Sequence, residues 1–449
     1  FQCRSAKMPH PHHLRKQLFI LFATLVALVA GESSSCPSWD EFGTKYPAIG
    51  RRTSQLVDTS RANRTLNVDI WYPAENNGEE FSQYNPLIPT SMMEGQYVAL
   101  DSPDVFGNGT NGYYPLLIFS HGAGGTRQSS AKLMEHLASW GFVVASPDHA
   151  GNSMNDVMGA SIPFNLEDRP KDISFVIDTM LSSEYVDKFL LQYAVDNGVG
   201  VLGHSYGGLT SLLVASNAQE WSDDRVKAIL PLSPAVEWGG GMGPGLMEER
   251  LPNIIVPTMV IGAENDTTTP VDPNNVAVFE KTNGSPRWNV VISNAGHSSF
   301  ADVCPVFDIL SSMLGEDTVY QLFGGGEIER GKYLMDQAFC AAVDEVQTIV
   351  GYYAVAFFSA ILLLDEDKRD QAIKCMNEES ANFSLTKFEF FYGSESTNEE
   401  TTDAATSSTT TPTSVPLVNG GAEEEEKEDR SSSGMLLLVS INTLSCLFL

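Results

Sequence analysis

Basic side chains are scarce in this chain of 449 residues. Lys and Arg together number 27, against 57 Asp and Glu, which gives a formal net charge of −30. Binding the phosphates of nucleic acid requires a basic face. The composition therefore argues against a nucleic-acid partner. Part of the acidic excess is local, because Glu423–Glu426 form a run near the C-terminus, and we interpret the rest as a contribution to solubility.

Apolar runs long enough to span a membrane are also scarce, since a spanning helix needs about 20 residues. Residues 18–30 are apolar, but the run is short, follows Arg15 and Lys16, and ends in small residues. This layout predicts a secretory signal peptide over 8–31. Residues 349–364 are almost wholly apolar. Their aromatics are not confined to the ends, which favours a buried helix over a transmembrane one.

The C-terminal part of the chain has a composition of its own. Residues 393–434 are rich in Ser, Thr and Glu, which predicts a disordered linker. Residues 435–449 form a hydrophobic tail, and Asn419–Ala422 supply small residues upstream of it. This is the layout of a GPI-attachment signal, and a short membrane anchor is the alternative. The residues between the signal peptide and the linker, 36–392, are predicted to form one domain.

Cysteine is infrequent, with six in the chain, and two of these lie in segments that we expect to be removed. An even number remains, which is typical of disulfide bonding in a secreted protein. Four cysteines allow three pairings, of which we favour Cys304 with Cys340 and Cys36 with Cys375. Glycosylation sequons also favour secretion; they fall at Asn63, Asn108, Asn265, Asn283 and Asn382.

Short apolar runs alternate with segments of helical spacing through the middle of the chain. This alternation predicts an α/β fold, with a mostly parallel central sheet and helices on both faces. Strands are expected at 64–73, 115–120, 142–147, 199–202, 226–231, 254–261 and 288–293, and helices at 129–140, 172–181 and 209–215.

The most informative stretch is Gly203-His204-Ser205-Tyr206-Gly207, which follows an apolar strand and leads directly into a helix. A serine on such a strand–turn–helix holds its Oγ above the top of a sheet, and glycines on either side permit the close backbone approach. We interpret Ser205 as a catalytic nucleophile. The alternative is an ordinary glycine-rich turn.

A serine hydroxyl needs an imidazole to accept its proton and an acid to orient that imidazole. On an α/β sheet these follow in the order Ser, acid, His. His297 is the one histidine after Ser205, so it is the predicted base. We choose Asp266, on the loop after the preceding strand, as the acid, with Glu264 and then Asp272 as alternatives.

The oxyanion of an acyl-transfer reaction requires two backbone N–H donors. One is expected from Tyr206, the residue after the nucleophile. The other is expected from Ala123, in the loop His121-Gly122-Ala123-Gly124 that follows an earlier strand; Gly122 is the alternative. His121 precedes Ser205 in the chain, so we interpret it as shaping this loop rather than acting as a base.

Several motifs together resemble the α/β-hydrolase group that contains type II platelet-activating-factor acetylhydrolases and predicted dienelactone-hydrolase-like proteins. They are Trp71-Tyr72-Pro73, Phe119-Ser120-His121-Gly122 and Gly203–Gly208. The resemblance covers about residues 63–362. It implies an α/β-hydrolase catalytic domain, a triad of Ser205, Asp266 and His297, an oxyanion hole at Ala123 and Tyr206, and no metal or organic cofactor. True dienelactone hydrolases are expected to use a Cys nucleophile, so that substrate is not expected here.

These observations predict a secreted or surface-anchored serine hydrolase that cleaves carboxylic esters through an acyl-enzyme. The expected substrates are short-chain phospholipid esters, other lipid esters or polyesters. The expected location is the cell surface or the extracellular space, with the C-terminal tail as the contact to a membrane. The alternatives are a catalytically inactive binding protein and a peptidase on the same fold.

Overall fold

The structure is a computed structural model, and it describes residues 46, 48–84, 98–107, 114–153, 166–217, 220–237, 245–323, 328–329, 332, 343–363 and 366–393. The predicted signal peptide over 8–31, the linker from 394 onward and the hydrophobic tail over 435–449 lie outside these residues. The same holds for Cys36 and Cys340.

Ten strands of the described chain form one sheet, in the order β10-β9-β8-β7-β6-β4-β5-β2-β1-β3. Six neighbouring strands are parallel to one another, namely β4, β5, β6, β7, β8 and β9. Strand β2 is antiparallel to β5, and β10 is antiparallel to β9. The strands are β1 (Ala48–Asp58), β2 (Arg64–Ala74), β3 (Leu100–Asp101), β4 (Leu116–Ser120), β5 (Val143–Pro147), β6 (Val199–His204), β7 (Val226–Leu232), β8 (Thr258–Ala263), β9 (Arg287–Ile292) and β10 (Leu385–Phe391).

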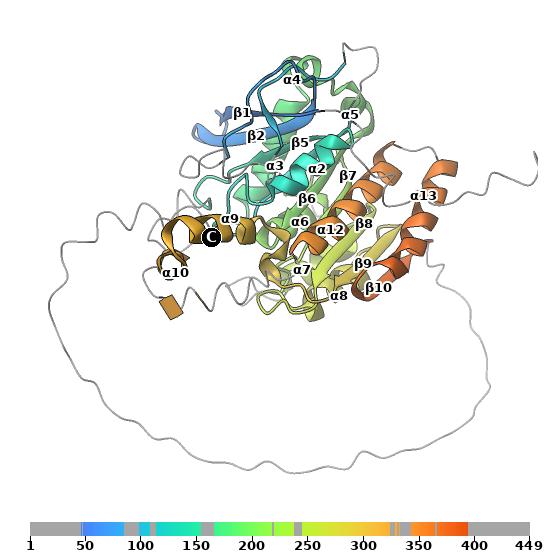
Figure 1. The fold of residues 1–449 in the computed structure, drawn as a ribbon. Helices are drawn as coiled ribbons and strands as arrows, with labels where there is room; N and C mark the ends of the chain where they lie inside the picture. The colour runs from blue at the N-terminus through green and yellow to red at the C-terminus, as the bar shows by residue number, and fades with distance from the viewer. Residues whose placement is uncertain are drawn as a thin grey trace, which may run out of the picture.

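Helices connect the parallel strands and cover the sheet (Figure 1). The α-helices are α2 (Ala131–Ser139), α3 (Asp168–Met180), α4 (Ser183–Phe189), α5 (Gln192–Asn197), α6 (Tyr206–Ala215), α7 (Gly245–Arg250), α8 (Val271–Lys281), α9 (Val303–Leu314), α10 (Glu316–Phe323), α12 (Val343–Phe358) and α13 (Glu366–Glu379). Shorter turns of helix are η3 (Leu251–Asn253), η4 (His297–Phe300), η6 (Ser359–Leu363) and η7 (Ser380–Asn382).

The sheet separates two hydrophobic cores, because successive side chains of a strand point to opposite faces. In β4, Leu117 and Phe119 pack with α2 and α12, whereas Leu116 and Ile118 pack with α3 and α6. All five residues of β4 are buried. This double burial explains why the central strands are continuous apolar runs rather than alternating ones, and it confirms the predicted α/β fold.

The apolar segment predicted as a buried helix forms α12 and η6. Among the described residues, Val343–Leu363 is the one helix whose length and composition would let it cross a membrane, and 72% of its most apolar window is buried within the protein. Its Phe357 and Phe358 contact Trp288 of β9 and Phe142, the residue before β5. The helix therefore covers one face of the sheet.

The structure corrects several predicted boundaries. The strand expected from Ile254 begins at Thr258, because Pro257 has no N–H to donate to a neighbouring strand. Helix α3 begins at Asp168, before the expected start at Asp172, with Pro170 in its first turn, where a proline is tolerated.

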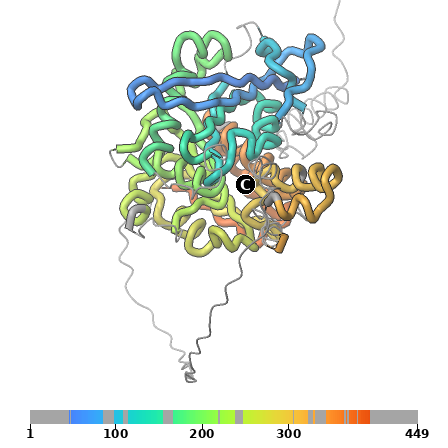
Figure 2. Tube along the Cα trace, turned by 90° about the vertical axis from the view of Figure 1, so that its left-hand side faces the viewer, coloured from blue at the N-terminus to red at the C-terminus, as the bar shows by residue number. Residues whose placement is uncertain are grey.

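Strands β1 and β10 were not predicted. Both are antiparallel additions at the sides of the parallel sheet, and the hairpin of β1 and β2 lies along one edge of the molecule (Figure 2). Polar residues interrupt both sequences, such as Arg51-Arg52 in β1 and Lys387 in β10. A strand of this kind owes its place to pairing with a neighbour, which its own sequence does not reveal.

Two of the predicted disulfide cysteines are described, and both Cys304 and Cys375 are disulfide-bonded. Cys304 lies near the start of α9 and Cys375 lies in α13. Since Cys36 and Cys340 lie outside the described residues, the pairing itself stays a prediction.

We predict that Gly207→Ala destabilises the fold by about 3 kcal/mol or more. The added methyl group would overlap backbone atoms, and no flexible side chain is there to move aside. A Cβ at Gly207 would lie 1.8 Å from the carbonyl oxygen of Ser120. Urea denaturation measures the loss. Gly122→Ala is the matched control, since its added Cβ would have its nearest contact at 3.5 Å. An unchanged midpoint for Gly207→Ala would contradict the prediction.

Candidate active site

Ser205 lies in the turn between β6 and α6, with φ 57° and ψ −117°. Such a conformation is strained for a residue with a side chain, and it persists only where the surroundings hold it. Here the N–H of Ser205 donates to the Leu232 carbonyl at 2.9 Å, and its own carbonyl accepts from the N–H of Ala235 at 3.1 Å. These bonds tie the turn to the end of β7 and hold Ser205 at the carboxyl edge of the sheet.

Asp266 and His297 meet at the same edge. Asp266 follows β8, and His297 begins η4 just after β9. Because β8 and β9 are parallel neighbours, the loops at their carboxyl ends lie side by side. The Nδ1 of His297 lies 2.8 Å from Oδ2 of Asp266, so the N–H of that ring nitrogen donates to the carboxylate. This leaves Nε2 of His297 as the basic nitrogen.

The carboxylate of Asp266 is held by several donors. Its Oδ1 accepts the N–H groups of Thr268 at 2.9 Å and Thr269 at 2.8 Å, and its Oδ2 accepts the Thr269 hydroxyl at 2.9 Å. Burial alone would raise the pKa of Asp266, but the hydrogen bonds from His297 and Thr269 bring the pKa below its ordinary value. The group therefore stays charged and keeps the imidazole in one tautomer.

The two alternative acids do not take this position. Glu264 is exposed, and its carboxylate accepts the N–H of Asn294 at 3.1 Å. Asp272 is also exposed, and it lies at the start of α8. Of the three candidates, Asp266 is the one that the structure joins to His297.

His204, the residue before Ser205, contacts His297. The imidazole of His204 donates from Nε2 to the His297 carbonyl at 2.8 Å, and the two ring centroids are 4.7 Å apart. Burial, followed by the nearby His297, lowers the pKa of His204 to about 3, so this ring is a neutral support. No hydrogen bond joins the Ser205 hydroxyl to the His297 ring within the described part of the chain; such bonds often tighten only when substrate is bound.

The loop after β4 also approaches Ser205. A Cβ placed on Gly122 would lie 3.5 Å from Cβ of Ser205, so the backbone of this loop directly adjoins the serine. The N–H of Gly124 donates to the Asn152 carbonyl at 3.2 Å, and that of Gly125 donates to the Gly122 carbonyl at 3.1 Å. The loop is thus a closed turn in which Ala123 follows the residue that adjoins Ser205. The role of Ala123 as an oxyanion-hole donor stays a prediction.

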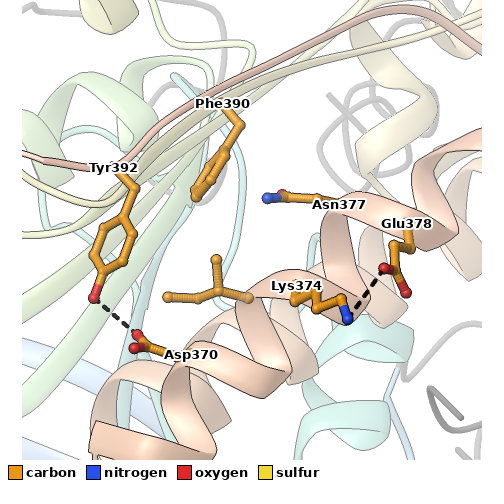
Figure 3. Close-up of a pocket in the computed structure, with 7 residues that line it drawn as sticks. Asp370, Lys374, Asn377, Glu378, Phe390 and Tyr392 are labelled. Carbon is orange, nitrogen blue, oxygen red and sulfur yellow. Dashed lines mark hydrogen bonds and ion pairs between the residues drawn. The ribbon is translucent and has the colours of Figure 1, made fainter. Parts of the chain in front are cut away.

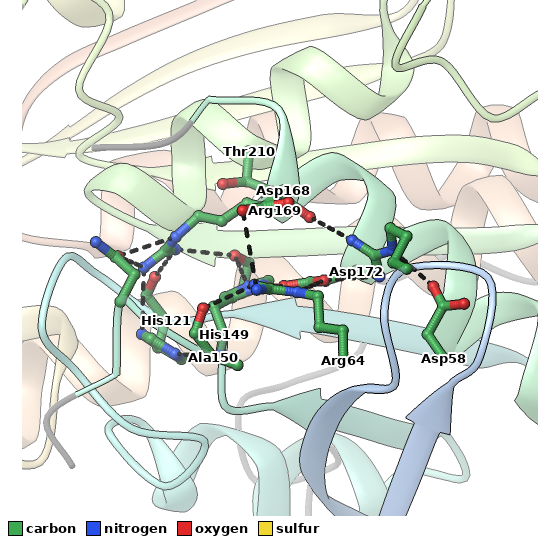
Figure 4. A network of polar contacts seen from close by, with 12 residues as sticks. Asp58, Arg64, His121, His149, Ala150, Asp168, Arg169, Asp172 and Thr210 are labelled. Carbon is green, nitrogen blue, oxygen red and sulfur yellow. Dashed lines mark hydrogen bonds and ion pairs between the residues drawn. The ribbon is translucent and has the colours of Figure 1, made fainter. Parts of the chain in front are cut away.

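Sequence reasoning missed Arg169, in the first turn of α3. This arginine is 2% exposed and donates to the carbonyls of His121 at 2.5 Å and Gly122 at 3.1 Å (Figure 4). It also binds the side chain of Asn152. The sequence offers no signal for this, because Arg169 stands between Asp168 and Pro170 at a helix start, where a solvated arginine is the usual expectation.

A second buried cluster supports this arginine (Figure 4). Asp172 accepts from Arg64 at 2.7 and 2.8 Å and from His149 Nδ1 at 3.0 Å. Although burial would raise the pKa of Asp172, Arg64 and His149 lower it to about 2. In turn, Nε2 of His149 accepts the Ser120 hydroxyl at 2.9 Å. The ends of β4 and β5 are therefore joined to α3 by charge-assisted hydrogen bonds.

A cavity of about 380 Å³ lies elsewhere, between α13 and β10 (Figure 3). None of Ser205, Asp266 and His297 lines it. Tyr392 donates to Asp370 at 2.8 Å and Lys374 lies 3.7 Å from Glu378, while the amide oxygen of Asn377 accepts from Trp288 at 3.0 Å. We do not assign it to the chemistry of Ser205. Within the ranges that the structure describes, no group of three or more His, Cys, Asp or Glu is arranged to hold a metal ion.

Comparison with known proteins places this geometry in context. A protein-family model described as the alpha/beta hydrolase fold matches residues 115–248. A ferulic acid esterase from Streptomyces cinnamoneus has a similar structure, with a TM-score of 0.50 and 21% identity, and the match covers 73% of this chain and 96% of the esterase. The chain therefore has the α/β-hydrolase fold that its motifs predicted.

Two cutinases of Thermobifida alba are similar in sequence. Cutinase est1 is 29% identical over 217 residues, which is 46% of this chain and 64% of the cutinase, and cutinase est2 is 30% identical over 205 residues, which is 44% and 59%. A bis(hydroxyethyl) terephthalate hydrolase of Streptomyces coelicolor is 28% identical over 205 residues, covering 43% of this chain and 56% of the hydrolase. The chain spans less than two thirds of the length of these relatives.

We predict that acid destabilises the fold because several buried histidines resist protonation, although Glu135, whose pKa burial raises to about 7, opposes this by binding a proton in the folded state. Burial is the main cause that lowers the pKa of His149 to about 4 and that of His204 to about 3, whereas an unfolded histidine titrates near pH ~6.5. Between about pH 6.5 and 4 the unfolded chain therefore binds more protons, and the free energy of unfolding falls as the pH falls, by about 1.4 kcal/mol per unit for each such histidine.

Thermal melts from neutral pH to about pH 4.5 test this. His149→Asn is expected to lower stability at pH 7 and to make the decline with pH less steep, because one titrating group is gone. Asp172 does not contribute in this window, since a carboxylate with a lowered pKa loses its stabilisation only as the pH falls through about 4 toward 2. A melting temperature that stays constant between these limits would contradict the assignment of neutral buried histidines.

Proposed function

We propose that this protein hydrolyses carboxylic esters through an acyl-enzyme, with Ser205 as nucleophile, His297 as general base and Asp266 as the acid that orients it. The observation that carries the proposal is the 2.8 Å hydrogen bond from His297 Nδ1 to Asp266, at the same sheet edge as the strained Ser205. The names of the cutinases and of the terephthalate-ester hydrolase support an ester as the substrate.

The reaction proceeds in two halves. Ser205 Oγ attacks the ester carbonyl carbon while Nε2 of His297 takes the hydroxyl proton, and the carbonyl oxygen becomes an oxyanion. The C–O bond to the alcohol then breaks, the alcohol leaves with the proton from His297, and an acyl-serine remains. A water molecule repeats the sequence on the acyl group, so the carboxylic acid is released and Ser205 is regenerated. In this scheme the N–H groups of Ala123 and Tyr206 stabilise both oxyanions.

The finer substrate class is also a proposal. The similarity to cutinases supports a substrate that is a polyester or a simple aliphatic ester. The resemblance to platelet-activating-factor acetylhydrolases instead favours a phospholipid with a short acyl chain. Both classes present an uncharged ester carbonyl to the same three side chains. Secretion is part of the proposal, and the disulfide bonds of Cys304 and Cys375 support it, since disulfides persist mainly in oxidising compartments.

We predict that Ser205→Ala lowers turnover of p-nitrophenyl butyrate by a factor of about 10⁴ or more, because a methyl group cannot form the acyl-enzyme. Release of p-nitrophenol measures turnover, and labelling by a fluorophosphonate probe should be lost in the same variant. If the variant and the unmodified protein hydrolyse the ester at equal rates, Ser205 is not the nucleophile.

We predict that Asp266→Asn lowers kcat by a factor of about 10³ to 10⁴, because the neutral amide no longer fixes the tautomer of His297 or stabilises its charged form. Glu264→Gln is the matched control, since this carboxylate is exposed and bonded to Asn294 instead. It should keep nearly full activity. An equal loss in both variants would indicate that the loop after β8 matters only for stability.

A comparison of hydrolysis rates on two substrates distinguishes the two proposed ester classes. Hydrolysis of polycaprolactone films and of a phosphatidylcholine with an acetyl group at the second position are compared at equal enzyme concentration. Preference for the film supports the cutinase-like proposal, and preference for the phospholipid supports the acetylhydrolase-like one. Ser205→Ala serves as the blank for both assays.

A further inference from the structure

The oxygen of the peptide unit that joins Gly122 to Ala123 accepts from three donors, one of which is the N–H of Gly125 in the same loop, at 3.1 Å. The Gly122 carbonyl accepts from Nη2 of Arg169 at 3.1 Å and from Nδ1 of His121 at 2.7 Å. The tautomer of His121 is consistent with this, because its Nε2 accepts the N–H of His149 at 3.1 Å. Two side-chain donors, in addition to the N–H of Gly125, therefore hold the carbonyl toward Arg169.

The direction of that carbonyl sets the direction of the next N–H. A peptide bond is planar and trans, so the C=O of Gly122 and the N–H of Ala123 belong to one rigid unit and point in opposite directions. With the oxygen bound beneath the loop, the Ala123 N–H points away from Arg169. This is the group that the proposed mechanism assigns to the oxyanion.

The same arginine also reaches the other half of the predicted oxyanion hole. Its guanidinium carbon lies 4.5 Å from the ring centroid of Tyr206, and Tyr206 supplies the second proposed N–H at the start of α6. Nη1 of Arg169 binds the His121 carbonyl at 2.5 Å, which holds the preceding peptide as well. One buried cation thus contacts the loop after β4 and the residue after Ser205.

We propose that Arg169 is a positioning residue that fixes the Ala123 backbone donor of the oxyanion hole and packs against the ring of Tyr206, which carries the second donor; this inference rests on the proposed ester hydrolysis. The planar guanidinium suits the task, because its several N–H groups bind the two carbonyls at once, and a lysine ammonium acts as a single point charge. Its positive charge on the peptide oxygen also strengthens the Ala123 N–H as a donor, since hydrogen bonds of a peptide polarise one another. Arg169 itself does not touch the substrate.

The test uses esters that differ only in the atom that the oxyanion hole receives. A p-nitrophenyl ester is compared with its thiono analogue, in which sulfur replaces the carbonyl oxygen and accepts hydrogen bonds poorly. Loss of one oxyanion-hole donor costs a factor of about 10² to 10³ in turnover. We expect Arg169→Met to lose about that factor in kcat for the oxygen ester, with KM little changed, and to lose much less for the thiono ester.

Arg169→Lys should recover part of the loss, because one carbonyl keeps a charged donor. Arg225→Met is the matched control for loss of an arginine that ties down α3, since Arg225 lies 2.8 Å from Asp178 near the other end of that helix. The control should keep the ratio of the two esters at its original value. Equal losses of both esters in Arg169→Met would overturn the inference, because a merely structural defect does not distinguish oxygen from sulfur.

A crystal structure of Arg169→Met makes the inference testable independently of activity. We expect the Gly122–Ala123 peptide to turn, so that the carbonyl no longer points inward. An unchanged peptide orientation would overturn the positioning role even if the protein hydrolyses esters. Conversely, absence of Ser205-dependent hydrolysis in the unmodified protein would refute the proposed function, while the orientation of the peptide would still decide the role of Arg169.

Discussion

The close contact between the turn after β6 and the end of β4 is the constraint on which the site depends. A Cβ at Gly203 would lie 2.7 Å from the Ser120 oxygen, and one at Gly207 would lie 1.8 Å from the same atom. No side chain fits between these two backbones. Their contact brings the turn at Ser205 against the loop that begins at His121, so the two proposed N–H donors lie on adjoining segments of backbone.

This contact also explains which parts of the molecule were predictable from the sequence. The glycines, the serine between them and the apolar strand before it form a local sequence pattern. The turn at Gly203–Gly207 is therefore predictable from a few consecutive residues. The parallel strands are similarly evident, because burial on both faces leaves them continuously apolar. Asp266 and His297 follow from chain order and from the loops that parallel strands must share.

The parts that were not predicted depend on partners distant in the chain. Strand β1 consists of polar and apolar residues in no clean pattern, and its place comes from pairing with β2 along its whole length. Arg169 is another such case. Its burial requires carbonyls from the loop after β4, an amide from Asn152 and a ring from Tyr206. No spacing in the sequence reports that these groups converge, because each lies on a different element.

The buried charges show how a strained turn can be supported without blocking it. Taking Arg169 out of water is unfavourable, and burial lowers its pKa to about 9, yet it remains charged at neutral pH. The unfavourable burial of Arg169 is offset by the carbonyl oxygens of His121 and Gly122. The nearby carboxylate of Asp172 binds Arg64 and His149 instead. A carboxylate beside the loop would repel a developing oxyanion, whereas a cation bound to the back of its peptides favours one. The arrangement places the positive charge of Arg169 on the carbonyls of the loop that begins at His121, and the negative charge of Asp172 on Arg64 and His149.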